Sequence, residues 1–208
     1  MTGNGGVVHI VDDDAAVRQS LAFMLSAAGL AVRVYESPAA FLDGLAGAQT
    51  GCLVTDVRMP DMTGLELLRR LRDKGCLIPA IVITGHGDVP LAVEAMKAGA
   101  LDFIEKPFEE AAILKAVRSA LEQGTGEEGG DAASVASRVA LLSERERQVL
   151  DGLIAGHPNK TIAYDLGISP RTVEVYRANV MTKMQAKSLS ELIRLAILAQ
   201  IPTRRAGK

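Results

Sequence analysis

The sequence predicts two domains: an α/β domain with a five-stranded, parallel, doubly wound sheet, and a smaller all-α domain of four helices. Three observations lead to this prediction. Residues 1–123 alternate short β-rich runs with helical patterns, residues 124–138 are rich in Gly, Ser, Ala and acids, and residues 139–208 show no strand pattern. A chain of 208 residues is long enough for two small domains. We therefore expect domains at 1–123 and 139–208, with a linker at 124–138.

The five expected strands are short runs rich in apolar and β-branched residues. They are Val7–Val11, Ala31–Tyr35, Cys52–Thr55, Ala80–Thr84 and Leu101–Ile104. The segments between them carry apolar residues at helical spacing, and Ser37-Pro38 has the pattern of a helix start. Strands that alternate with helices form a parallel sheet covered on both faces, as in flavodoxin-like folds. In such sheets the functional groups gather at the carboxyl ends of the strands.

The C-terminal helices are predicted from their first residues. Ser143 followed by Glu146 has the spacing of a capping box, in which each side chain accepts a backbone N–H of the other residue. The other three helices are expected to open with caps at Asn159, Ser169 and Ser188. Gly167 lies between the second and third of these helices, in the position of the short turn of a helix-turn-helix.

Charge is divided unevenly along the chain. The net charge is −2 overall, but it is −5 over residues 1–123, −2 over residues 124–138 and +5 over residues 139–208. An acidic half joined to a basic half suggests that only the second half meets a polyanion such as DNA.

Composition points to a globular protein of the cytoplasm. Hydrophobic residues make up 48% and charged residues 23% of the chain. No apolar run approaches the roughly 20 residues that span a bilayer, and the N-terminus lacks the pattern of a secretory signal. We therefore expect no membrane association. Cys52 and Cys76 lie in or beside apolar runs without metal-type spacing, so we expect both to be reduced core residues.

Polar residues follow four of the expected strands. Asp12-Asp13-Asp14 ends the first strand, Asp56 the third and Thr84 the fourth, and Lys106 follows the fifth. Carboxylates brought close together repel one another, so they take up protons or hold a divalent cation. Oxygen ligands and partial hydration suit Mg²⁺. A carboxylate beside Mg²⁺, an ammonium and a hydroxyl can accept a phosphoryl group.

The motifs I-V-D-D-D, T-D-V-R-M-P-D-M-T-G, V-I-T-G and E-K-P-F resemble the receiver domain of bacterial response regulators over residues 7–122. The resemblance implies that Asp56 is the phosphorylation site, and that Thr84 and Lys106 contact the phosphoryl group. The same resemblance assigns Asp12, Asp13, Asp56 and the backbone carbonyl of Arg58 to Mg²⁺, and Phe103 to an aromatic switch that acts with Thr84. Asp14 is expected to be a helix cap. The Lys106–Pro107 peptide is expected to be cis, as it typically is in receivers.

The basic half is expected to read DNA through its third helix. The first residues of the second helix in a helix-turn-helix reach base edges in the major groove, and nearby lysines neutralise phosphates. That helix is expected to present Arg171, Glu174, Val175, Arg177 and Ala178 to DNA, and the lysines placed to neutralise phosphates are Lys160, Lys183 and Lys187. Val173 is expected in the packed corner of the two helices, with Ile162, Ala163, Leu166 and Ile168.

Residues 139–200 resemble the LuxR-type DNA-binding domain. The resemblance implies that the recognition helix carries Thr172, Val173, Glu174, Val175, Arg177 and Ala178. A receiver followed by such a domain is the arrangement of the NarL/FixJ class. Glu174 and Tyr176 stand where many relatives have Lys or His. Glu174 can accept a hydrogen bond from a cytosine amino group, which alters the expected choice of bases, and Tyr176 is expected to contact a phosphate. Several motifs are most similar to the FixJ type, a regulator of nitrogen-fixation or microaerobic genes. That similarity implies a sensor histidine kinase of the FixL type, promoter DNA and RNA polymerase as partners. It also implies a homodimer that forms on phosphorylation, through the fourth helix (about 88–98) and the fifth strand.

Two other functions remain open at this point. One is a LuxR-type regulator that is not controlled by phosphorylation, although four Phe, three Tyr and no Trp leave little aromatic material for a ligand pocket. The other is an aspartyl-phosphate phosphatase. Such enzymes usually place a second Asp two residues after the nucleophile, where this chain has Arg58, a poor general acid at neutral pH. We therefore expect a transcriptional activator and not an enzyme.

Overall fold

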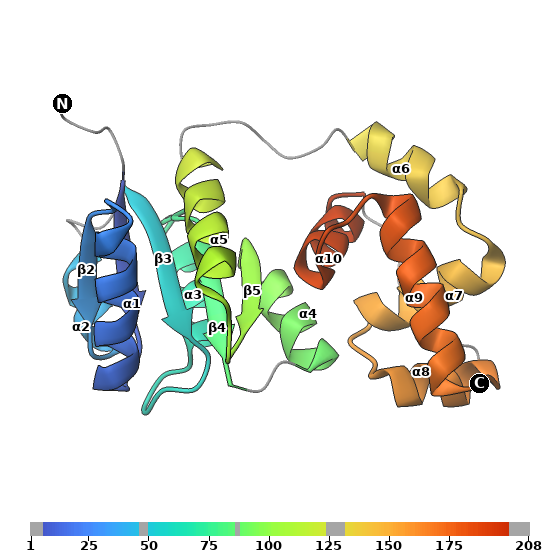
Figure 1. Cartoon of the computed structure of the whole chain (residues 1–208), viewed down its shortest axis with the longest axis horizontal. Helices are drawn as coiled ribbons and strands as arrows, with labels where there is room; N and C mark the ends of the chain where they lie inside the picture. The colour runs from blue at the N-terminus through green and yellow to red at the C-terminus, as the bar shows by residue number, and fades with distance from the viewer. Residues whose placement is uncertain (1–5, 46–49, 86–87, 124–131, 200–208) are drawn as a thin grey trace. The chain divides into compact units, whose positions relative to one another are not determined.

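The computed structural model describes residues 6–45, 50–85, 88–123 and 132–199. They form two compact units. The first unit holds a parallel sheet with flanking helices, and the second is entirely helical (Figure 1). The predicted fold class is confirmed for both parts of the chain.

The sheet has five parallel strands in the order β2-β1-β3-β4-β5. The strands are β1 (Val7–Val11), β2 (Val32–Tyr35), β3 (Gly51–Asp56), β4 (Ala80–Thr84) and β5 (Asp102–Glu105). Each predicted strand is present, and no strand end differs from its prediction by more than one residue. Each crossover between parallel strands contains a helix, as the geometry of parallel pairing requires.

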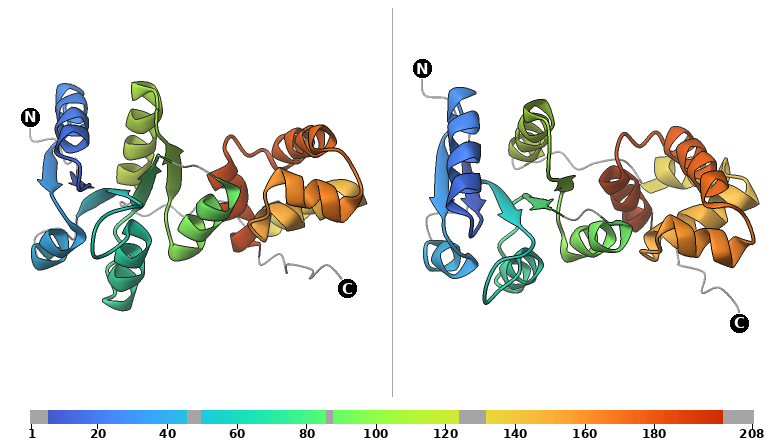
Figure 2. Two further views of the ribbon diagram at one scale, coloured as in Figure 1. Left: turned by 90° about the horizontal axis from the view of Figure 1, so that it is seen from below. Right: turned by 60° about the horizontal axis from the view of Figure 1, so that its bottom comes forward.

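Helices cover both faces of the sheet. They are α1 (Ala15–Ala27), α2 (Pro38–Asp43), α3 (Gly64–Asp73) and α5 (Glu110–Gln123), and α4 (Val89–Ala98) follows β4 in the chain. Side chains of α1 and α5, such as Leu25 and Val117, pack on alternate residues of the strands, such as Ile10 and Ile83. Figure 2 shows α2 and α3 on the opposite face. β1, β3 and β4 are covered on both faces, so every residue of these strands is buried except the first of β1 and the first of β3, which are half-buried.

The helix starts follow local capping rules. Asp14 accepts the N–H groups of Ala16 and Val17 at the start of α1, and Ser37 caps α2 with Pro38 in the first turn. Both caps are as predicted. Asp14 is therefore committed to the backbone of α1, which leaves Asp12 and Asp13 as the acids available at the end of β1.

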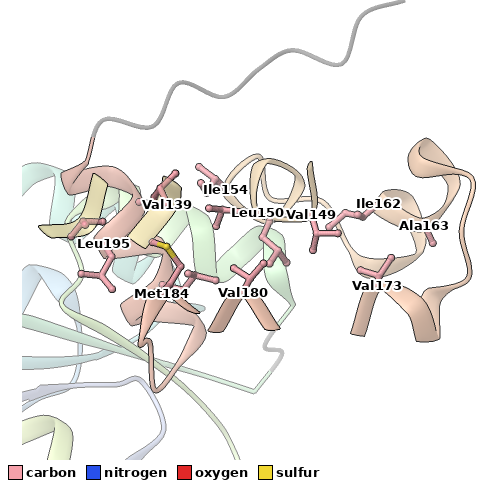
Figure 3. Packing of buried hydrophobic residues seen from close by; sticks show 14 residues of the cluster. Val139, Val149, Leu150, Ile154, Ile162, Ala163, Val173, Val180, Met184 and Leu195 are labelled. Carbon is pink, nitrogen blue, oxygen red and sulfur yellow. The ribbon is translucent and has the colours of Figure 1, made fainter. Parts of the chain in front are cut away.

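The second unit contains α6 (Ala132–Ala140), α7 (Glu144–Ile154), α8 (Asn159–Leu166), α9 (Pro170–Met184) and α10 (Leu189–Leu198), and it also takes in residues 88–97, nearly all of α4. Figure 3 shows the side chains that make up its core, among them Val149, Val173, Val180 and Met184. The predicted caps at Ser143, Ser169 and Ser188 are confirmed. The predicted cap at Asn159 is wrong: Asn159 is the first residue of α8, and Pro158 before it offers no side-chain hydrogen bond.

Helix α6 overlaps the segment that we expected to be a linker. Residues 124–131 of that segment lie outside the described residues. Val135 and Val139 of α6 are buried in the core of the second unit. The helical unit therefore includes residues N-terminal to the expected boundary at residue 139.

Both cysteines are free thiols. Cys52 is fully buried in β3, and burial raises the pKa of its thiol to about 12. Cys76 is only half-buried, so the expectation of a core position holds for Cys52 alone. Within the described ranges, the helices are too short or too polar to cross a membrane.

Candidate functional site: an acidic pocket and a recognition helix

The carboxyl ends of the central strands bring the predicted pocket residues to one edge of the sheet. Val11 pairs with Thr55, Asp56 with Ile83, and Thr84 with Glu105. The carboxyl ends of these strands therefore lie side by side, and they carry Asp12, Asp56, Thr84 and Lys106. Asp12, Asp56 and Thr84 are at least nine-tenths buried.

Lys106 joins two carboxylates that are far apart in the sequence. Its Nζ donates to Oδ1 of Asp56 at 2.7 Å and to Oδ2 of Asp12 at 2.9 Å. The Lys106–Pro107 peptide that follows is cis, as predicted. A positive charge shared by two buried carboxylates offsets their mutual repulsion and the loss of hydration.

The same contacts set the protonation of the pocket. Burial raises the pKa of Asp12, because it outweighs the hydrogen bonds from Lys106 and from the Asp14 backbone, which act in the opposite direction. Burial alone would lower the pKa of Lys106, but the hydrogen bonds and charges of Asp56 and Asp12 outweigh it and raise that pKa. Lys106 is therefore an ammonium at neutral pH, and it can stabilise negative charge beside Asp56.

Three further contacts shape the pocket, and the sequence patterns did not predict them. The backbone N–H of Arg58 donates to Oδ2 of Asp56 at 2.6 Å, and Arg18 of α1 donates to the backbone carbonyl of Asp12 at 2.6 Å. Gly64 lies against the backbone of Asp56, since a Cβ at this position would be 2.1 Å from the Asp56 carbonyl oxygen. Gly64 is part of the T-G motif in the sequence, but the need for a glycine there is evident only from its close approach to the Asp56 backbone in the fold.

Two predicted pocket residues lie apart from this hydrogen-bonded group. Asp13 is exposed, and Phe103 is half-buried in β5, opposite Val82 of β4. In the part of the chain that the structure describes, no three His, Cys, Asp or Glu side chains are grouped closely enough to hold a metal ion. Asp12 and Asp56 are thus brought together, whereas Asp13 is not.

The second site is the outer face of α9. Arg171, Glu174, Val175 and Ala178 are exposed, whereas Val173 and Val180 are fully buried. Gly167 precedes the helix with φ +63°, a left-handed backbone that favours glycine and closes the turn between α8 and α9. The turn and the caps place the first turn of α9 at the surface, as a helix-turn-helix requires.

Some of the predicted DNA contacts have other roles in the fold. Val173 is in the core (Figure 3), as the apolar pattern predicts, so the DNA contact that the family resemblance implied for it is wrong: a side chain with 0% exposure cannot touch a base. Lys183 forms an ion pair with Glu146 of α7 at 2.7 Å and is therefore not an unpaired cation for phosphates. Thr172 bonds to the cap residue Ser169, and Tyr176 packs against the core. Lys160 and Lys187 are exposed.

The two units match two known families. Residues 8–118 match the response regulator receiver domain, and residues 140–196 match the bacterial regulatory proteins of the luxR family. The chain belongs to the response-regulator family. Its receiver and LuxR-type domains make it a two-component transcriptional response regulator. The family is one of transcription regulators and not of catalysts.

Several FixJ proteins are close relatives of this response regulator. It is 62% identical to the transcriptional regulatory protein FixJ of Azorhizobium caulinodans over 93% of both chains. It is 60% identical to FixJ of Rhizobium meliloti over 91% of this chain and 94% of the relative. Among solved structures, full-length FixJ from B. japonicum is 54% identical, with a TM-score of 0.56, over 95% of this chain and 98% of that chain. The regulator is therefore FixJ-like.

Proposed function

We propose that Asp56 accepts a phosphoryl group from a sensor histidine kinase. A carboxylate oxygen of Asp56 attacks the phosphorus of a phosphohistidine, the phosphorus–nitrogen bond breaks, and the histidine takes up a proton as it leaves. The contact of 2.7 Å between Lys106 and Asp56 is the observation that carries this proposal. The ammonium lies where negative charge accumulates on the phosphoryl oxygens. Thr84, buried at the end of β4, supplies a hydroxyl on the next strand.

The donor set at this edge fits Mg²⁺. Asp12 and Asp56 offer carboxylate oxygens, and Asp13 and the backbone carbonyl of Arg58 add two more oxygen donors. Mg²⁺ favours such oxygen ligands and keeps several waters. Because Asp13 is exposed and the described residues form no ready-made cluster of three acids, Asp13 has to join the other two when the ion binds. When bound, the ion neutralises charge on the transferred group.

Phosphorylation acts on the rest of the chain through Thr84 and Phe103. The Thr84 hydroxyl turns toward the new phosphoryl oxygens, and the half-buried Phe103 ring moves into the space that it leaves. This change biases the receiver between two states, and the phosphorylated state dimerises through the receiver. A dimer brings two LuxR-type domains to a two-fold promoter site.

Helix α9 enters the major groove of promoter DNA in this proposal. Arg171 lies in its exposed first turn, and Lys160 and Lys187 lie on the surface in α8 and before α10, where they can neutralise phosphates. By analogy with the FixJ relatives, the regulator activates nitrogen-fixation or microaerobic genes together with RNA polymerase. Its kinase partner is of the FixL type, and both work in the cytoplasm, where the promoters are.

Phosphoryl transfer to Asp56 is tested by intact-mass measurement after incubation with a small acyl phosphate and Mg²⁺. The wild type is expected to gain one phosphoryl group, which hydroxylamine removes, and Asp56→Asn is expected to gain none. Asp61→Asn is the matched control, because Asp61 is an exposed aspartate in the loop after β3. Equal incorporation by Asp56→Asn and the wild type would show that the acceptor lies elsewhere.

A further inference from the structure

The outer face of α9 carries a stripe of exposed residues. Its members recur three or four positions apart, as residues on one side of a helix do. They are Arg171, Glu174, Val175, Ala178, Asn179 and Thr182. The opposite side is closed against the core by Val173, Val180 and Met184. A groove that receives this helix therefore meets a guanidinium, a carboxylate, an isopropyl group and a methyl group in its first half.

Glu174 is the member of the stripe that most restricts a DNA partner. It is exposed, and it forms no ion pair with the described part of the chain. A bare carboxylate facing DNA is repelled by the phosphates, so its presence there has to be offset by a hydrogen bond from a base. An ionised carboxylate accepts hydrogen bonds and donates none.

The major groove offers hydrogen-bond donors on only two bases. Cytosine presents its N4 amino group and adenine its N6 amino group, whereas guanine and thymine present acceptors that repel a carboxylate. Adenine also carries the N7 acceptor next to its amino group, which repels the second carboxylate oxygen. Cytosine has no acceptor beside its N4 group on the groove edge. Glu174 therefore favours cytosine.

Val175 restricts the neighbouring position. Its side chain is 56% exposed, although the valines at 173 and 180 in the same helix are fully buried. It has no hydrogen-bonding group, so it gains from a base edge only by apolar contact. The C5-methyl group of thymine is the apolar group on the major-groove edges of the bases. Ala178, one turn later, is small enough to leave room for that contact.

We propose that Glu174 and Val175 select, in each promoter half-site, a cytosine and a thymine at most one base pair apart. This inference rests on the proposed entry of α9 into the major groove, and it adds the bases that α9 reads. Glu174 and Val175 are thus specificity-determining residues, whereas Arg171, Lys160 and Lys187 supply affinity that is independent of sequence.

The inference is tested by selecting duplexes from a randomised pool with the full-length protein treated with acyl phosphate and Mg²⁺. The wild type is expected to enrich a cytosine with a thymine at most one base pair away. Gln at position 174 pairs with adenine N6 and N7. Glu174→Gln is therefore expected to change cytosine to adenine at that position, with a change in relative affinity of at least about fivefold. Glu144→Gln removes an exposed carboxylate from the first turn of α7 and is expected to enrich the wild-type sequence.

The proposed contact of Val175 with thymine is tested by removing the C5-methyl group of the base. Replacing the selected thymine by deoxyuridine removes only the C5-methyl group, and it is expected to weaken wild-type binding about threefold. Val175→Ala is expected to bind the two duplexes equally. If Glu174→Gln enriches the same bases as the wild type, or if deoxyuridine binds the wild type as well as thymine does, the assignment of bases is wrong. If the wild type enriches no sequence at all, the proposed DNA-binding function itself fails.

Discussion

Lys106 Nζ lies 2.7 Å from Oδ1 of Asp56, a residue fifty positions earlier in the chain. The same ammonium lies 2.9 Å from Oδ2 of Asp12. One cation therefore holds together two carboxylates that would otherwise repel each other in a partly buried place. A phosphoryl group added to Asp56 would bring new negative charge next to this cation. The ammonium of Lys106 is therefore already in place to stabilise that charge.

Removing the ammonium is expected to slow phosphorylation. In Lys106→Met the phosphoryl oxygens lose their nearest fixed cation, and we expect the rate of incorporation from an acyl phosphate to fall about 100-fold. Rapid-quench measurement of phosphoprotein gives this rate. Lys115→Met, which removes an exposed lysine of α5, should leave the rate unchanged. A Lys106→Met protein that is phosphorylated as fast as the wild type would remove Lys106 from the proposed chemistry.

Gly64→Ala is expected to destabilise the receiver. The added Cβ would come within 2.1 Å of the Asp56 carbonyl oxygen, so the β3 end or the start of α3 has to move. Overpacking of this kind costs about 1–3 kcal/mol in the free energy of unfolding, which urea unfolding measures. Gly85→Ala is the control, because a Cβ there meets nothing within 4 Å. Equal stability of the two variants would mean that the close approach at Gly64 is relieved without cost.

Receiver stability is expected to fall at mildly acidic pH because of His9. Its ring is fully buried and packs against Tyr35 and Phe41. Burial lowers the pKa of His9, with a smaller contribution from the charge of Arg33. The unfolded chain therefore binds a proton more readily than the folded one. The contribution of His9 to stability is complete above the unfolded pKa of about 6.5, and it is lost as the pH falls below that value toward the folded pKa.

Urea unfolding of the full-length protein between pH 8 and pH 5 measures this effect. His9→Leu is expected to lose less stability than the wild type over the same range. Asp12 acts in the opposite direction, because a raised carboxyl pKa makes the folded state bind protons more readily, so the comparison with the variant is what isolates His9. A wild type that becomes more stable relative to His9→Leu as the pH falls would reverse the predicted sign.

Two valines two positions apart in α9 are expected to behave differently. Val173→Ala removes two buried carbon atoms and leaves a cavity, so it should cost about 2 kcal/mol in the unfolding of the helical unit. Val175→Ala removes a side chain that is 56% exposed and should change the stability by less than about 0.5 kcal/mol. Thermal unfolding followed by circular dichroism compares them. If Val175→Ala is the more damaging variant, the assignment of the inner and outer faces of α9 is wrong.

Much of the fold could be predicted because local rules and the tertiary structure agree. The apolar runs of β1, β3 and β4 are buried on both faces, and Ser143, Ser169 and Ser188 cap helices as their spacing predicts. Asn159 was misplaced because its side chain can cap a helix, yet the helix includes it and starts after Pro158. Capping preferences identify a helix start only to within a residue or so.

The residues of the acidic pocket could be predicted from the sequence, but several of the contacts between them could not. Strand-end aspartates and a Lys-Pro pair identified Asp12, Asp56 and Lys106 as neighbours, because parallel strands bring their carboxyl ends to one edge. The pattern could not reveal Arg18 on the Asp12 carbonyl or Gly64 against Asp56, since both depend on distances across the fold. The apolar pattern placed Val173 in the core, and only the family resemblance made it a candidate DNA contact. The ion pair of Lys183 with Glu146 could not be predicted, because it joins residues of two helices across the fold.

The coupling of Asp56 to DNA binding is tested most directly by promoter-fragment affinity, measured with and without acyl phosphate and Mg²⁺ at one fixed salt concentration. The wild type is expected to bind at least about tenfold more tightly after treatment, a coupling free energy of about 1.4 kcal/mol. Asp56→Asn is expected to keep its untreated affinity under both conditions. Equal tightening of the wild type and Asp56→Asn, or no change in either, would contradict phosphorylation of Asp56 as the switch.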